Sequence, residues 1–435
     1  MRAPLIGVIF LSTGSAPMFA QAIADRASLA PILSHLDLRQ GERQLACDVE
    51  PVKPSLSFGF RFRAGYIFRV PLTQYSGARH RWSVVTEITP EGTSQPVTLV
   101  DVVRLPAILN NKMLGEAGGG YLLGEGRYRV RWILLDDLGR VCRKGWQIEV
   151  RLSRSESSAK VAMPPNSVAD LSLRGMANGN RHPDEGRPMR LSVLVDAAPL
   201  FQRRLAKTVL SAEDHVFLIN VLSALLERVP TSWVRVVVFN LEQQRELFRR
   251  DGFTLESLDD MSRAMNELKL ATVDYRILQN KRGHIAFVAN LVNQELRASP
   301  PSDAAIFLGP RERFQDNVPT EAFDQEHGPA PQFFFLRYRP FPSPLRQSLL
   351  RRADPCDPLE IGSESGEAPR GRSRNNPCPI TPGNGTDTTG AFSNDTISLA
   401  VKSLKGKAIA IQSPGEFAKA IEQVERLVGA VSAAR

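Results

Sequence analysis

Two patterns of apolar and polar positions divide the chain. From residue 47 to 152, short runs of alternating apolar and polar residues are separated by prolines and glycines. This alternation is typical of half-buried strands, and about six or seven short strands at this spacing predict an antiparallel β-sandwich. Gly118-Gly119-Gly120 lies among the runs and predicts a turn. The expected strands are residues 56–62, 66–72, 81–88, 97–103, 127–135 and 140–152.

From residue 189 onward, continuous apolar runs alternate with segments that have helical spacing. The pattern predicts a doubly wound, mostly parallel, Rossmann-like α/β domain of about five strands. Ser211 precedes an acid by three residues and is expected to cap the first helix. The expected strands are residues 190–195, 233–239, 303–308, 332–338 and 407–412. The expected helices are residues 211–229, 254–270, 284–296, 398–404 and 414–427.

Composition between the two patterns sets the expected domain boundaries. Residues 153–188 are polar, with the proline and glycine content of a linker. Residues 339–394 interrupt the α/β pattern as a long insertion rich in Pro, Gly, Ser and Asn. The expected order is a signal peptide (1–22), an N-terminal lead (23–46), a β-sandwich (47–152), the linker (153–188) and the α/β domain (189–435).

The N-terminus has the pattern of an export signal. Arg2 precedes the apolar run 5–11, and Ala20-Gln21-Ala22 fits the small-x-small rule for cleavage. No later segment reaches the roughly 18 consecutive apolar residues that a spanning helix needs. We therefore expect a secreted or periplasmic protein with no integral membrane segment after signal cleavage.

Cysteine usage agrees with export. An even number of cysteines in an exported chain favours disulfides, and this chain has four. Zinc binding is the alternative, but it would need closely spaced cysteine pairs, which the sequence lacks. Pairing within regions predicts the disulfides Cys47–Cys142 and Cys356–Cys378.

Charge adds little to the functional assignment. The formal net charge is +9, but the basic residues are dispersed along the chain. A nucleic-acid-binding surface needs a basic stripe with interleaved aromatic residues, so we expect no nucleic acid partner. Attraction to an anionic cell envelope remains open.

Residues 189–200 resemble the first strand of a von Willebrand factor type A domain. That family has Asp-x-Ser-x-Ser here and uses it to hold a divalent metal. In this chain Asp196 is present, but Ala198 and Leu200 replace the two serines. The strand expected to supply a second acid ends in Leu308-Gly309-Pro310. The resemblance therefore implies a divergent type A-like domain, similar to secreted bacterial proteins related to that family, without a metal ion or other cofactor.

Residues 124–132 resemble the tyrosine corner of immunoglobulin-like sandwiches. In that motif a tyrosine near the start of a late strand ties its hydroxyl back to the upstream loop. Tyr128 is the tyrosine here, and Val130 stands where antibody-type domains have their second cysteine. The resemblance implies an immunoglobulin-like fold and carries no implication for activity.

Catalytic motifs are weak throughout the chain. Gly362-Ser363-Glu364-Ser365-Gly366 has Glu where a hydrolase elbow needs Ser, and the histidines are dispersed. Without a paired nucleophile and base, the sequence favours a non-enzymatic binding or adhesion protein with a protein or cell-envelope partner. The alternative is an exported hydrolase-like enzyme with its site at the carboxyl edge of the α/β sheet.

The expected binding edge follows from the same topology. In open α/β sheets, the loops at the carboxyl ends of the strands form the crevice that binds ligands. The residues expected there are Asp196, Asn240, Arg311 and Arg313.

Overall fold

The structure of the chain is a computed structural model. The residues that it describes are 8–10, 22–23, 33–34, 41–75, 77, 79–107, 113–171, 188–200, 209–270, 275–280, 282–312, 314–324, 330–338 and 395–434. Within these residues, no helix combines the length and the apolar character needed to cross a bilayer. Most of the expected signal peptide and the cysteines Cys356 and Cys378 lie outside the described residues.

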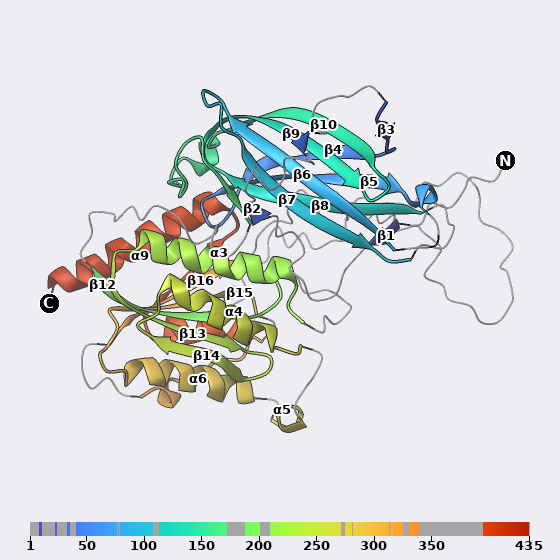
Figure 1. The fold of residues 1–435 in the computed structure, drawn as a ribbon. Coiled ribbons are helices and arrows are strands. Elements are labelled where there is room, and N and C mark those ends of the chain that lie inside the picture. Colours follow the sequence, from blue (N-terminus) through green and yellow to red (C-terminus); the bar gives the residue numbers. More distant parts are fainter. Residues whose placement is uncertain are drawn as a thin grey trace, which may run out of the picture.

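The N-terminal β region (the described residues between 8 and 171) consists of two sheets that pack face to face (Figure 1). The order in the first sheet is β1 (Val8–Phe10), β8 (Leu114–Leu123), β5 (Phe62–Pro71) and β4 (Asp48–Leu56), with β11 (Val168–Asp170) also pairing with β8. The order in the second is β2 (Ala22–Ile23), β7 (Val97–Leu105), β6 (His80–Pro90), β9 (Gly126–Asp136), β10 (Arg140–Val150) and β3 (Arg43–Gln44).

Aromatic side chains fill the space between these two sheets. The Phe68 ring of the first sheet lies 5.6 Å from Trp82 and 5.4 Å from Trp132 of the second, measured between ring centroids. All three side chains are almost fully buried. Each of them faces inward from a strand whose side chains alternate between the two faces of its sheet, so the period-two pattern of the sequence produces this core.

Two predicted ties of the β region are present. Cys47, just before β4, forms a disulfide with Cys142 on β10, with a Cα–Cα distance of 6.3 Å. The Tyr128 hydroxyl lies 2.9 Å from the Gly124 carbonyl oxygen and 3.1 Å from that of Ser167, so its proton can be donated to either. The first tie joins the two sheets covalently, and the second holds the start of β9 against the loop before it.

The C-terminal region (residues 188–434) contains a third sheet of six strands. Its order is β14 (Arg245–Asp251), β13 (Thr231–Asn240), β12 (Met189–Asp196), β15 (Ala304–Pro310), β16 (Gln332–Tyr338) and β17 (Lys407–Ile411). Strand β14 is antiparallel to β13, and the other neighbouring pairs are parallel.

Helices cover both faces of the third sheet. One face packs against α3 (Ala212–Arg228), α4 (Leu258–Asn266) and α9 (Pro414–Ala434), and the other against α6 (Gly283–Leu296) and α8 (Thr396–Ser403). The short helix α5 (Tyr275–Gln279) lies apart from this packing (Figure 1). Ser211 caps α3 as predicted, because its side chain accepts a hydrogen bond from the Asp214 amide.

The predicted fold class is wrong. The structure is mostly β, with 42% strand and 27% helix, and it lacks a clear doubly wound Rossmann-like domain. The alternation of strand and crossover helix breaks at β13–β14, which is an antiparallel hairpin. It breaks again between β15 and β16, where the described residues hold only the 3-10 turn η4 (Thr320–Ala322). The sequence of β14, Arg-Glu-Leu-Phe-Arg-Arg-Asp, is too polar for the apolar-run criterion to detect.

The glycine-rich segment was also misassigned. Gly118, Gly119 and Gly120 lie inside strand β8 and pair with β5. A Cβ at Gly118 would lie 2.7 Å from the Tyr66 carbonyl oxygen, so the close approach of the two strands requires glycine there. Part of the expected linker is likewise structured, since β11 adds to the same sheet.

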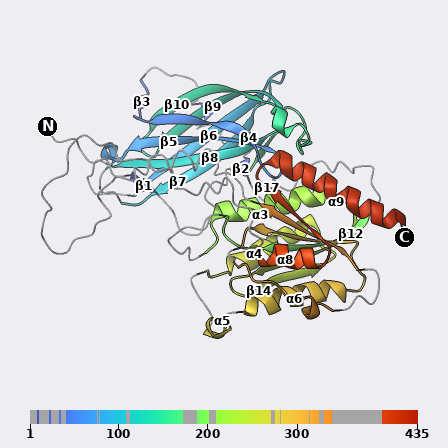
Figure 2. The ribbon, with the colours of Figure 1, turned by 180° about the vertical axis from the view of Figure 1, so that it is seen from behind.

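A buried interface joins the N-terminal β region to α3 and α9 (Figures 1 and 2). The Phe60 ring stacks on Phe417 of α9 at 5.6 Å between centroids. Arg61 NH2 donates to both carboxylate oxygens of Glu227 on α3, at 2.8 and 3.0 Å. The exposed fraction of these two side chains is 0% and 4%. The segment 56–62, expected to be a strand, is in fact the end of β4, the turn that carries Arg61 and the first residue of β5.

We expect Glu227→Gln to lower the free energy of unfolding by about 3 to 5 kcal/mol, because it leaves a buried guanidinium without its counter-charge. Urea denaturation measures this change. The double variant Arg61→Met/Glu227→Leu should recover most of the loss, since no charge is then left buried. The control is Asp260→Asn, which breaks the exposed pairs of Asp260 with Arg250 and Arg263 and should cost no more than about 1 kcal/mol. Equal effects of the two single variants would contradict this assignment.

We expect the double variant Cys47→Ser/Cys142→Ser to lose about 2 to 5 kcal/mol of unfolding free energy, because the disulfide closes a long loop in the unfolded chain. The matched control, Cys356→Ser/Cys378→Ser, leaves this tie intact. Unfolding by urea with and without a reductant is the measurement. Reductant should destabilise the control variant by a similar amount, because Cys47–Cys142 is the disulfide that this variant retains. A control variant whose stability does not respond to reductant would contradict the expectation.

Candidate functional site

Two of the residues expected at the binding edge are buried. Asp196 ends β12 and is 0% exposed, and its Oδ1 accepts a hydrogen bond from the Leu241 amide at 3.4 Å. Asn240 ends β13 and is also 0% exposed, and its Nδ2 donates to the Ala197 carbonyl at 2.9 Å. These side chains tie the loops after β12 and β13 to each other and present no surface to a partner.

The two arginines expected at this edge differ from that pair. Arg311 follows β15 and is exposed, and it takes part in an interaction within the structure. Arg313 lies outside the described residues. The predicted edge is therefore not one exposed surface in the described part of the chain.

Glu312 was not among the residues predicted at this edge, although Arg311 and Arg313 on either side of it were. It comes two residues after Pro310, the last residue of β15. Glu312 is 3% exposed and is hydrogen-bonded to Asp196. Gly309 makes room for this contact, because a Cβ there would lie 2.9 Å from the Asp196 Cβ. The spacing of an acid shortly after a strand end was the available signal.

The pKa values of both carboxyl groups are raised. Burial raises the pKa of Asp196 to about 6. Burial, followed by the charge of Asp196, raises the pKa of Glu312 well above its ordinary value. The hydrogen bond between them lowers the pKa of Asp196 and raises that of Glu312, so Glu312 is the group that keeps its proton and donates to Asp196. Such a pair has the chemistry of a general acid and base, but both side chains are sealed from solvent.

Metal-ligating side chains do not gather in the described ranges. No group of three or more His, Cys, Asp or Glu side chains there is arranged to hold a metal ion. The prediction that Asp196 binds no metal stays a prediction.

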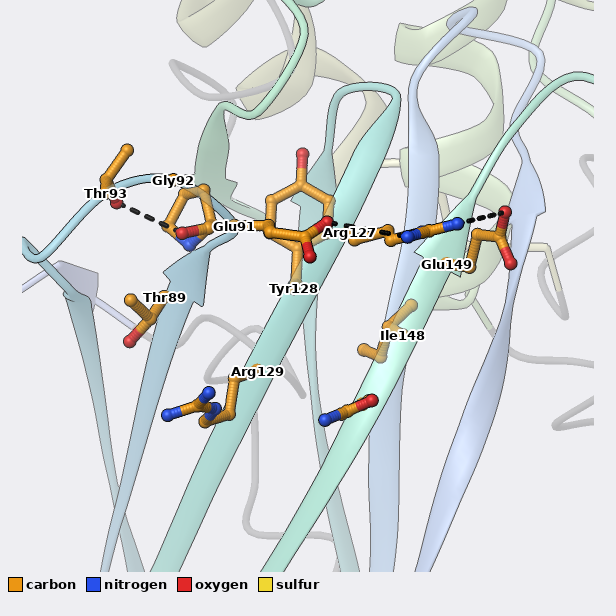
Figure 3. Close-up of a pocket in the computed structure, with 11 residues that line it drawn as sticks. Thr89, Glu91, Gly92, Thr93, Arg127, Tyr128, Arg129, Ile148 and Glu149 are labelled. Atoms are coloured by element: carbon orange, nitrogen blue, oxygen red, sulfur yellow. Dashed lines mark hydrogen bonds and ion pairs between the residues drawn. The ribbon is translucent and has the colours of Figure 1, made fainter.

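A groove of about 530 Å³ opens on the outer face of β6, β9 and β10 (Figure 3). Its walls are the end of β6 with the turn that follows, the start of β9 and the end of β10. It is lined by Thr89, Pro90, Glu91, Gly92, Thr93, Arg127, Tyr128, Arg129, Gln147, Ile148 and Glu149.

Strand register arranges the polar side chains of this face in rows. Arg127, Arg129 and Arg131 alternate along β9 with inward-facing residues. Arg129 pairs in register with Thr89 of β6 on one side and with Gln147 of β10 on the other. We call these three residues the central row.

The rows on either side of the central row carry their own counter-charges. Arg127 lies 3.8 Å from Glu91 and 4.0 Å from Glu149, and Arg131 lies 3.7 Å from Glu87. Arg129 has no ion pair or hydrogen bond with any described residue, and Figure 3 shows its guanidinium in the groove without a partner. The central row is therefore the one of the three whose positive charge is not compensated.

Sequence reasoning missed this groove, because its walls come from three strands. The Arg-x-Arg-x-Arg alternation of residues 127–131 was visible. Its neighbours, however, depend on which strands flank β9 and in which register, and no local pattern specifies that.

No protein-family model matches the chain, and no curated protein is significantly similar to it. A hypothetical protein from Pyrococcus horikoshii OT3 is similar in structure, with 14% identity and a TM-score of 0.19, over 27% of this chain and 99% of that one. A superoxide reductase (neelaredoxin) from Ignicoccus hospitalis has 12% identity and a TM-score of 0.18, over 24% and 80% of the two chains. Likenesses at these scores support no conclusion about fold or activity.

We expect the unfolding free energy to fall as the pH rises through about 6, because the folded-state pKa of Asp196 lies above its unfolded value. The folded state then holds the extra proton between about pH 4 and 6 and loses that advantage at higher pH. Glu312→Gln keeps a hydrogen-bond donor beside Asp196 and removes the second acid. Between pH 5 and 8 it should therefore lose less unfolding free energy than the wild type, because one of the two groups with a raised pKa is gone.

Urea denaturation at the two pH values measures this difference. The exposed Glu267 provides the control, and Glu267→Gln should retain the wild-type pH dependence. A Glu312→Gln variant with the same pH dependence as the wild type would show that the two carboxyl groups are not coupled.

Proposed function

We propose that this chain is an exported, non-enzymatic binding protein that contacts a protein partner through the groove on β6, β9 and β10. The observation that carries the proposal is the exposed Arg129, which has no counter-charge among the described residues. A guanidinium offers a planar fork of donors, and interfaces between proteins use it accordingly. By contrast, Asp196 and Asn240 at the sheet edge are buried and paired.

Export is supported from two directions. The Cys47–Cys142 disulfide is compatible with an oxidising compartment, in which such bonds persist. The N-terminal pattern of Arg2, an apolar run and Ala20-Gln21-Ala22 is that of a cleavable signal. The resemblance of residues 189–200 to a type A domain stays a prediction within this proposal.

A hydrolase-like enzyme is the second candidate, and the Asp196–Glu312 pair is the observation that favours it. A substrate would have to reach carboxyl groups that are 0% and 3% exposed. The binding function needs no such opening, so it is the one that the geometry supports better.

The test compares the groove with the edge in the same binding measurement. The full chain is used to isolate a partner from envelope extract of the source organism, and the purified partner is then titrated with variants. Arg129→Glu should weaken binding at least about tenfold, since it reverses the charge that the partner would meet. Arg311→Glu/Arg313→Glu, at the predicted edge, should leave the affinity unchanged.

Both variants must keep the wild-type thermal midpoint, so that a change in affinity is not caused by unfolding. Loss of binding in the edge variant with retention in Arg129→Glu would contradict the proposal and return the site to the sheet edge. Retention in both variants would contradict a role for either surface.

A further inference from the structure

We propose that the central row, Thr89–Arg129–Gln147, binds a single carboxylate group on a peptide of the partner. This inference deepens the function proposed above and rests on it for the identity of the partner as a protein. The ligand class follows from the charges and hydrogen-bonding groups that the three rows place side by side.

The central row combines one cation with neutral hydrogen-bonding groups. Arg129 can donate two parallel hydrogen bonds to a carboxylate, which is the strongest pairing available to this side chain. Thr89 and Gln147 flank it in register on the two neighbouring strands, and a hydroxyl and an amide can each donate to an oxygen. An anion that enters this row therefore meets donors on three adjacent strands.

The neighbouring rows limit the charge of the ligand. On one side of the central row, Glu91 and Glu149 share the single arginine Arg127, which leaves one carboxylate in excess. On the other side, Glu87 is matched by Arg131. A phosphate or a polyanion would bring its extra negative charge close to the excess carboxylate. A single carboxylate uses the uncompensated charge of Arg129, and positive groups next to it in the ligand would be attracted by the acids.

The groove has room for a short stretch of peptide. Its volume of about 530 Å³ lies within the range of pockets that hold small ligands. The favoured ligand is therefore an acidic side chain flanked by basic residues. A free C-terminal carboxylate offers the same chemistry, and the experiment separates these two sources.

The experiment titrates the full chain with defined probes and follows the Nε–H resonance of Arg129 by NMR, assigned by its loss in Arg129→Gln. The probes are acetyl-Lys-Glu-Lys-amide, its neutral match acetyl-Lys-Gln-Lys-amide, acetyl-Lys-Gln-Lys with a free carboxylate, and inorganic phosphate. The glutamate peptide should produce a saturable shift, and the neutral peptide should produce none. Saturation by the peptide with the free carboxylate would assign the terminal source instead of the side chain.

Matched variants test the charge argument. Arg129→Gln should weaken the glutamate peptide about tenfold, the loss expected for a charged hydrogen bond. Gln147→Glu replaces the side-chain amide with a carboxylate and gives Arg129 the kind of ion-pair partner that Arg127 has, so it should abolish binding. Arg129→Gln lacks the Nε–H resonance, so tryptophan fluorescence is used to follow peptide binding to that variant. Arg104→Gln, which removes another exposed arginine of the same sheet, should have no effect.

Three results would overturn the inference. These are phosphate that binds as tightly as the glutamate peptide, a neutral peptide that saturates equally, and a Gln147→Glu variant that retains binding. The probes are added without the partner. A glutamate peptide that binds, together with a partner whose affinity is unchanged by Arg129→Glu, would therefore refute the proposed function alone. The reverse pattern would refute the carboxylate site alone.

Discussion

The arrangement of the molecule depends on the buried ion pair between Arg61 and Glu227. Arg61 comes from a turn of the N-terminal β region and Glu227 from helix α3, and both side chains are nearly inaccessible to solvent. Buried charges are costly unless each has its counterpart, so this pair permits one docking of the two regions and penalises others. The remaining guanidinium contact, Arg61 NH1 to the Gly59 carbonyl at 2.8 Å, holds the turn in the shape that reaches α3.

Local sequence patterns predicted the parts of this fold that local physics determines. The Ser211 cap of α3, the buried run of β16 and the pairing of Cys47 with Cys142 agree with the structure. The errors arose where neighbours decide the conformation. Glycines 118–120 form a strand because β5 approaches them closely, and β14 is a strand because β13 offers it an edge. Neither partner is visible in the segment itself.

The same distinction explains the candidate site. An apolar run ending in Asp196 was a sound basis for placing an acid at the sheet edge, but burial depends on what packs over it. Glu312 and Asp196 meet because β15 is the parallel neighbour of β12, so the residues after the two strands lie at the same edge. A mutual hydrogen bond then takes the place of solvent. The groove lies on the other region of the molecule, where outward positions of three strands come into register. The outward positions of an alternating strand reveal less about structure than the inward ones, since any polar or charged residue is compatible with them.

The groove is also mechanically connected to the interface. Strand β10 carries Gln147 and Glu149 and continues into the turn η2 (Arg154–Glu156), which Ser153 caps together with Glu156. That turn packs against the start of α9, where a Cβ at Gly415 would lie 2.3 Å from the Ser155 carbonyl oxygen, so only glycine allows the approach. The Ser158 hydroxyl donates to the Gly415 carbonyl at 3.2 Å. One wall of the groove is therefore anchored, within a few residues, to a helix that packs on the third sheet. At the proposed carboxylate site, a wall held in this way would reduce the ordering cost of binding, which a site with a single uncompensated charge needs in order to be specific.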